Sequence, residues 1–167
     1  MKKILLGLMV VMAIFSMSCK SAPTLAGVSI EGEVTQERVD RALGQIYDAY
    51  RSRLDMTGAQ EYIVQRGDTL SEITRTFYGN VENVGIAGLR NGFYFPLLML
   101  ASRHATIVDP DQIEPGMRLV VPDLAKNIAN AGSRQAIKEF LTDVAYVYNR
   151  KNDPITESGL LALARSL

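Results

Sequence analysis

Few residues in this sequence have the types and the spacing that catalysis or metal binding requires. The chain has one cysteine, Cys19, and one histidine, His104, which follows Arg103 near the predicted end of a helix and fits a surface position. These two side chains cannot supply the four ligands of a structural zinc site. The sequence also lacks a Gly-x-Ser-x-Gly turn and a zinc-protease motif. It therefore predicts no metal and no cofactor.

Glu61 and Glu72 could in principle act as the two carboxylates of a glycosidase. Exposed carboxylates are ordinary, however, and nothing in the surrounding sequence marks either one as catalytic. The segments 35–60 and 123–167 have helical patterns and are too short to build a separate catalytic core. We therefore expect no catalytic residue and no enzymatic activity.

The start of the chain predicts export. Lys2 and Lys3 precede an uncharged apolar run over residues 4–15, which is the layout of a secretory signal. The apolar run is too short to span a bilayer comfortably. Export implies a location outside the cytoplasm.

The residues up to the cysteine carry a more specific signal. Residues 1–18 resemble a bacterial lipoprotein signal that is cleaved before Cys19. The resemblance implies a lipid on Cys19 that anchors the protein to a cell-envelope membrane, facing the periplasm or the cell surface. Ser16 and Ser18 stand where such signals usually have Leu and Gly or Ala. A secretory signal cut farther on, after Ala26, and an uncleaved anchor are the alternatives.

Two blocks in the middle of the chain predict a small α+β unit. The first, YIVQRGDTLSEITRTFYG at 62–79, is a β-prone run, a Gly-Asp turn and a short helix that Asp68 or Thr69 can cap. The second, DPDQIEPGMRLVVP at 109–122, is a Pro-Gly turn and a β-prone run. The apolar residues 96–101 predict another helix between them. Two antiparallel strands with two helices on one face are expected.

This order of elements resembles the LysM module over residues 62–122. LysM modules bind glycans that contain N-acetylglucosamine, in bacteria chiefly peptidoglycan, between the loop after the first strand and the loop before the second. Backbone amides and carbonyls in a shallow groove suit neutral sugars. The resemblance implies seven glycan-binding residues: Gly67, Asp68, Thr69, Leu70, Asp111, Gln112 and Ile113. Each has a structural alternative as part of a turn, a cap or the core.

Three features depart from the usual pattern of LysM modules, and one of them is that this chain has a single copy where bacterial glycan binders often carry several in tandem. The module is longer than usual, and the excess at about 80–95 could cover the groove, extend it or form a partner surface. Ser102 stands where the family often has Asn, which leaves open how that turn is held. The aromatic residues 93–95 could stack on a sugar, but positions in the core are the simpler interpretation.

The flanks of the module have different compositions. Residues 19–34 are rich in small residues with Pro and Gly and predict a flexible tether. An amphipathic helix is expected over 35–57 and a helical region over 123–167. The apolar stripes of these helices either pack within the protein or contact a partner. They consist of Val39, Leu43, Ile46 and Tyr50 before the module and of Ile137, Phe140, Leu141 and Val144 after it.

The charge balance and the motifs together favour one function. Eighteen basic and eighteen acidic residues give a formal net charge of zero, which disfavours nucleic acid as a partner. We expect a non-catalytic envelope lipoprotein that binds peptidoglycan through one LysM module and tethers the membrane to the cell wall. The alternative is a LysM-fold scaffold that has lost glycan binding and contacts proteins of an envelope complex through its flanking helices or the 80–95 insertion.

Overall fold

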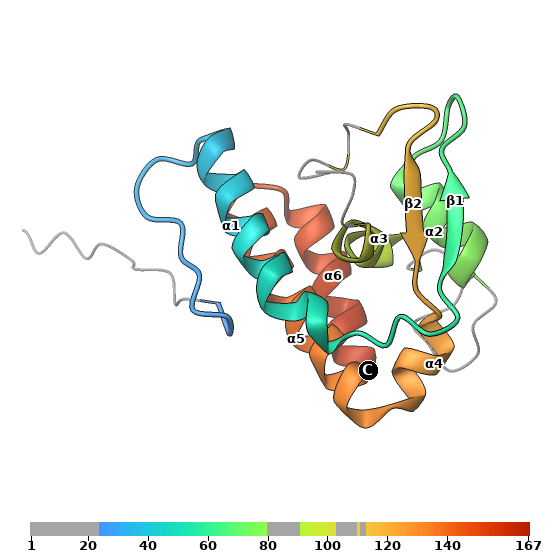
Figure 1. Cartoon of the computed structure of the whole chain (residues 1–167). Coiled ribbons are helices and arrows are strands. Elements are labelled where there is room, and N and C mark those ends of the chain that lie inside the picture. Colours follow the sequence, from blue (N-terminus) through green and yellow to red (C-terminus); the bar gives the residue numbers. More distant parts are fainter. Residues whose placement is uncertain (1–23, 80–90, 103–109, 111–112) are drawn as a thin grey trace, which may run out of the picture.

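A computed structural model describes residues 24–79, 91–102, 110 and 113–167 (Figure 1). The predicted α+β class is confirmed, with a strand-helix-helix-strand unit and further helices before and after it. The elements in chain order are α1 (Gln36–Tyr50), η1 (Arg51–Arg53), β1 (Gln60–Ile63), α2 (Leu70–Tyr78), η2 (Asn91–Tyr94), α3 (Phe95–Ala101), β2 (Arg118–Val121), α4 (Leu124–Ala129), α5 (Ala131–Arg150) and α6 (Pro154–Ser166).

The two strands form an antiparallel sheet in which Tyr62 lies opposite Leu119. Successive side chains of a strand point to opposite faces. Leu119 and Val121 are buried on the face that packs against the helices, whereas Ile63 is 52% exposed on the other face. The sheet therefore has one core face and one solvent face.

Ser102 holds the end of α3 against the sheet. Its backbone N–H donates to Leu98, and its Oγ accepts a 2.8 Å hydrogen bond from the backbone N–H of Val120. Ser102 is buried, so this bond satisfies a strand N–H that has little access to water. A serine thus fastens this turn where an asparagine is usual.

The described part of the 80–95 insertion belongs to the core; residues 80–90 lie outside the described residues. Asn91 Nδ2 donates a 2.7 Å hydrogen bond to the carbonyl of Tyr78 at the end of α2. Tyr94 and Phe95 are buried, which confirms the core interpretation for both. Phe93 packs on α6 at Gly159, where an added Cβ would lie 2.6 Å from the ring. The insertion therefore joins the module to the last helix.

The flanking helices bury their apolar stripes against each other. The Tyr47 and Tyr50 rings of α1 lie 5.9 and 5.7 Å from the Phe140 ring of α5. All eight residues of the two predicted stripes are buried, in one hydrophobic cluster with the core of the module. These apolar faces are thus used within the molecule.

The first helix is shorter than predicted. The expected range was 35–57, but α1 ends at Tyr50 and one 3₁₀ turn carries the chain to Arg53. At Leu54 the backbone is extended. The Asp55 N–H donates to the buried Asn127 side chain at 2.9 Å, which directs the chain toward β1. A long-range contact therefore sets this boundary.

The prediction of a flexible tether over 19–34 is wrong for residues 24–34, which we call the N-terminal strap. Its Val28 and Ile30 are buried, and the backbone N–H groups of Leu25 and Ala26 donate to the Asp143 carboxylate at 2.7 and 2.8 Å. Farther along the strap, Ile30 N–H donates to the Tyr146 hydroxyl, and Arg38 and Arg150 donate to strap carbonyls. The α1–α5 pair therefore holds the strap in place.

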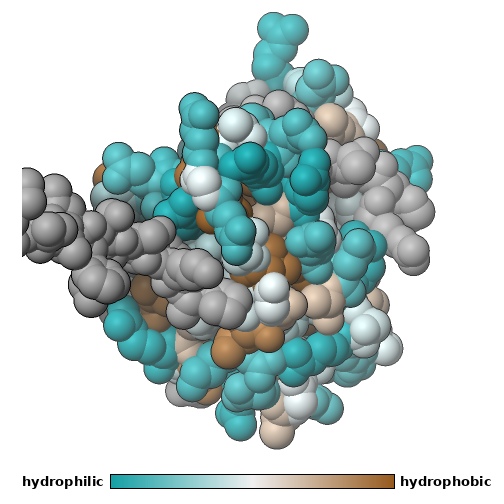
Figure 2. Space-filling model, turned by 90° about the vertical axis from the view of Figure 1, so that its left-hand side faces the viewer, coloured by the Kyte–Doolittle hydropathy of each residue, from teal (hydrophilic) through white to brown (hydrophobic). Residues whose placement is uncertain are grey.

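The face formed by the strap and α1 is largely hydrophilic, with hydrophobic surface in limited areas between polar side chains (Figure 2). Leu25, at the start of the strap, is 68% exposed. Within the described ranges, no helix combines the length and the apolar composition needed to cross a membrane.

Candidate functional site

The loop between β1 and α2 and the turn before β2 meet at one end of the sheet (Figure 1). Val64 N–H donates to the Met117 carbonyl at 2.9 Å, and Gly116 N–H donates to the Val64 carbonyl at 2.8 Å. These two bonds extend the strand pairing beyond Ile63. They place the predicted β1–α2 loop beside the segment that begins at Ile113.

Gly67 and Gly116 give the two loops their sharp turns. Both have φ of +92°, a conformation that side chains other than glycine rarely adopt. A Cβ at either position would meet no atom within 4 Å. Glycine is required here for backbone conformation, and the space around both residues stays open.

Asp68 fixes the β1–α2 loop from inside. Its Oδ2 accepts hydrogen bonds from the Tyr62 hydroxyl and from the Gln65 N–H, both at 2.7 Å. The bond to the Asp68 carboxylate raises the pKa of the Tyr62 phenol above its ordinary value, with a smaller effect of burial. The Tyr62 ring packs edge-on against Phe77 of α2 at 5.7 Å. One oxygen of Asp68 therefore shapes the loop.

The side chains of Thr69 and Glu72 interact at the start of α2, where Thr69 is the N-cap. The Thr69 Oγ1 accepts from the Glu72 N–H at 3.2 Å and donates to the Glu72 carboxylate at 3.1 Å. The first helical residue, Leu70, is 2% exposed and belongs to the core. The cap fixes the exposed Thr69 at the loop surface.

The predicted site residues that the structure describes differ from one another in exposure. Gly67 and Thr69 are exposed, Asp68 and Ile113 are partly buried, and Leu70 is buried. Asp111 and Gln112 lie outside the described residues, as do Cys19 and His104. Sequence reasoning missed Tyr62 and Val64 as the residues that hold the loops. A tyrosine six positions before an aspartate across a Gly turn was the available signal.

The carboxylates considered for hydrolysis have other partners. Glu61 pairs with Arg118 at 3.8 Å on the open face of the sheet, and Glu72 belongs to the cap of α2. Among the described residues, no group of three His, Cys, Asp or Glu side chains is arranged to hold a metal ion.

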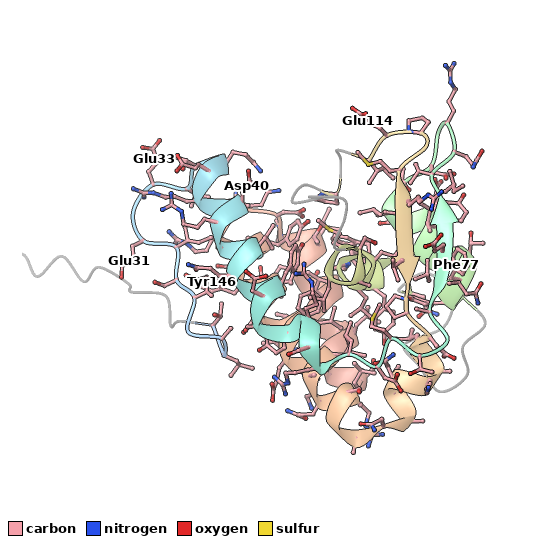
Figure 3. All side chains as sticks on the ribbon, viewed as in Figure 1. Glu31, Glu33, Asp40, Phe77, Glu114 and Tyr146 are labelled. Carbon is pink, nitrogen blue, oxygen red and sulfur yellow. The ribbon has the colours of Figure 1, made fainter. Side chains whose placement is uncertain are left out.

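The loop end of the module lies away from the strap. Glu114, in the turn before β2, and Phe77 of α2 lie at one side of the molecule, and Glu31 and Glu33 of the strap lie at the opposite side (Figure 3). The body of helices α1, α5 and α6 stands between the strap and the sheet (Figure 1). The two ends can therefore face different surroundings.

Comparisons with known proteins agree with this architecture. The LysM domain family model matches residues 62–122. Two esterases of Mycobacterium tuberculosis, from strains CDC 1551 and H37Rv, are each 34% identical to this chain over 80 residues, which is 48% of this chain and 14% of each esterase. No solved structure matches significantly. Residues 62–122 are thus a LysM domain, a module that binds peptidoglycan and related N-acetylglucosamine glycans.

Proposed function

We propose that this protein is a non-catalytic lipoprotein of the cell envelope that binds peptidoglycan through its LysM domain and tethers a membrane to the cell wall. The observation that carries the proposal is the family match to residues 62–122, combined with two exposed loops that β1 and β2 bring together. Gly67 and Thr69 are exposed there, and backbone amides and carbonyls in such a loop suit the hydroxyl and acetamido groups of a neutral sugar.

The position of the strap supports the tethering role. The five peptide units between Cys19 and Thr24 can span at most about 18 Å. From Thr24 onward the strap is bound to α5, because Asp143 accepts two of its N–H groups. A lipid on Cys19 would therefore hold the folded body close to the bilayer, with the sugar-binding loops on the far side (Figure 3).

The esterase activity that the two relatives' names state is not part of the proposal. The match covers 14% of each relative, so most of each esterase has no counterpart in the aligned segment. We infer a binding protein from the family match and from the absence of a hydrolase motif in the sequence.

The alternative role as a scaffold for protein contacts has less support. The apolar stripes of α1 and α5, which such a role would use, are buried against each other. In the proposed function, the α1–α5 pair stabilises the fold and the loops bind the glycan.

Sedimentation with insoluble peptidoglycan tests the glycan proposal. Gly67→Val in the detergent-solubilised full chain should abolish pelleting, and Gln112→Ala should weaken it several-fold, the effect of one hydrogen bond of about 1 kcal/mol. Gly27→Val is the matched control, because Gly27 also has a positive φ of 75° with no atom near its Cβ, but lies in the strap. Binding should change little between low and high salt.

The outcomes separate the two roles. Pelleting of the parent and of Gly27→Val, but not of folded Gly67→Val, supports glycan binding by the loops. Failure of the folded parent both to pellet and to bind chito-oligosaccharide at millimolar concentration rejects it in favour of the scaffold role.

Membrane fractionation tests the anchor separately. Cys19→Ala should release the protein from the membrane fraction and abolish labelling by a fatty-acid analogue. A parent protein that takes up no label and fractionates like the variant contradicts lipidation.

A further inference from the structure

A cavity of about 200 Å³ lies where the LysM domain meets the turn between α5 and α6. From the domain it is lined by Thr69 and Leu70, two of the predicted glycan-binding residues, and by Phe95 of α3. From the C-terminal helices it is lined by Tyr148 and Lys151. The cavity therefore adjoins the loop site but is built in part by residues outside the family motif.

The accessible surface of the cavity is mainly polar, with a smaller apolar part. Leu70, Phe95 and Tyr148 are buried, and the rings of Phe95 and Tyr148 pack edge-to-face at 6.1 Å. Thr69 and Lys151 are exposed at the rim. A mainly polar surface with a small apolar part suits a sugar, because the hydroxyl groups of a sugar need hydrogen-bond partners.

The rim groups are held in position. Lys151 Nζ lies 5.1 Å from the centre of the Tyr148 ring. The Asp153 carboxylate accepts from the Thr156 N–H at 3.0 Å and from its hydroxyl at 2.7 Å, and thereby caps α6. One ammonium and one carboxylate balance each other, so the rim suits a neutral ligand whose hydroxyls both donate and accept hydrogen bonds.

We propose that this cavity is an additional sugar subsite, which takes one N-acetylhexosamine unit of a glycan whose neighbouring units lie on the LysM loops. The inference rests on the proposed glycan binding. The volume supports a single unit, because sites for larger ligands measure roughly 300–1,000 Å³. Thr69 and Leu70 belong to both surfaces, so one chain can pass from the loops into the cavity. The C-terminal helices thus contribute to recognition of longer glycans.

Chito-oligosaccharides of increasing length test the subsite by calorimetric titration of the full chain. Lys151→Met removes the ammonium from the rim and should lower the affinity for the longest oligomers about five-fold, the effect of one hydrogen bond. The affinity for the shortest oligomer that binds should not change. Lys138→Met, at an exposed lysine earlier in α5, is the matched control and should behave as the parent at every length.

Asp153→Asn provides a second variant that keeps the fold, since asparagine caps helices as well as aspartate. This variant should also lower the affinity for long oligomers and leave the affinity for the shortest one unchanged. In the parent, amide resonances of Asp153 and Thr156 should shift on addition of long oligomers and stay in place with short ones.

Each remaining outcome overturns the subsite. Unchanged affinity for long oligomers in both variants, or equal losses for short and long oligomers, rejects it while loop binding stands. A parent that binds no oligomer of any length rejects glycan binding itself, and the subsite with it.

Discussion

The N-terminal strap and the β1–α2 loop are both held by an aspartate, but the two aspartates find their partners at different distances along the chain. Asp68 accepts from a backbone N–H and a tyrosine hydroxyl that lie three and six residues away. Asp143 accepts from two backbone N–H groups and a tyrosine hydroxyl that lie 93 to 118 residues away. The same chemistry is local in one region and tertiary in the other.

The two aspartates also differ in burial. Asp143 is 1% exposed, whereas Asp68 is only partly buried. Hydrogen bonds to a buried charge are more costly to lose, because water cannot replace the missing partner. The strap therefore depends on the whole fold, while the β1–α2 loop is held largely by hydrogen bonds within itself.

Removal of the buried carboxylate should have the largest effect. Asp143→Ala leaves the Tyr50 hydroxyl and two strap N–H groups without their acceptor, and should lower the free energy of unfolding by about 3 kcal/mol. Urea denaturation measures the loss, and limited proteolysis should detect cleavage within 24–34. A loss below about 1 kcal/mol would mean that the strap is not tied through this residue.

Removal of the Asp68 carboxylate should lower the free energy of unfolding by a smaller amount. Asp68→Ala should lower the free energy of unfolding by about 1 kcal/mol, because water can reach the Gln65 N–H once the carboxylate is gone. The same denaturation measurement applies. A loss as large as that of Asp143→Ala would contradict the distinction between a local and a tertiary anchor.

The smallest expected effects concern Tyr50 and Tyr62, the tyrosines that donate to Asp143 and Asp68. Burial and the bond to Asp143 raise the pKa of Tyr50, and burial also raises that of Tyr47. A folded-state pKa above the unfolded value of about 10 means that the contribution of these tyrosines to stability is constant below pH 10 and falls as the pH rises further. Near neutral pH, Tyr50→Phe should lower the free energy of unfolding by about 1 kcal/mol, and Tyr62→Phe should lower it by less.

Denaturation at alkaline pH checks the tyrosine prediction. Above pH 10, Tyr50→Phe should lose stability less steeply than the parent, because it lacks one of the buried phenols that must ionise on unfolding. Equal slopes for the parent and Tyr50→Phe would show that Tyr50 titrates alike in the folded and unfolded states.

Much of the module could be predicted because its signals are local. The strand, the glycine turn, the capped helix and the returning strand each follow from residues within a dozen positions, and Thr69 is the one of the two expected residues that caps α2. The tether prediction failed because a small-residue segment with Pro and Gly looks the same whether or not a distant acceptor binds it. Nothing near residues 24–34 points to Asp143.

The candidate site divides in the same way. Gly67 and Thr69 could be predicted from the motif, and their backbone conformation and capping bonds agree with it. The cavity beside them could not, because Lys151 and Tyr148 lie about eighty residues farther on and approach only when α5 packs beside α3. The spacing of apolar residues predicts which face of a helix is buried, but it does not identify the element that this face packs against.

The LysM unit, the turn glycines, the cap of α2 and the apolar stripes could be predicted from the sequence alone, since they depend on backbone preference and on periodicity over one or two turns. Three features depend on contacts between distant parts of the chain: the stripes face each other, α1 stops at Tyr50, and Asp143 holds the strap. The physical reason is that a buried hydrogen bond or ring contact is defined by both partners, and its partner can lie anywhere along the chain.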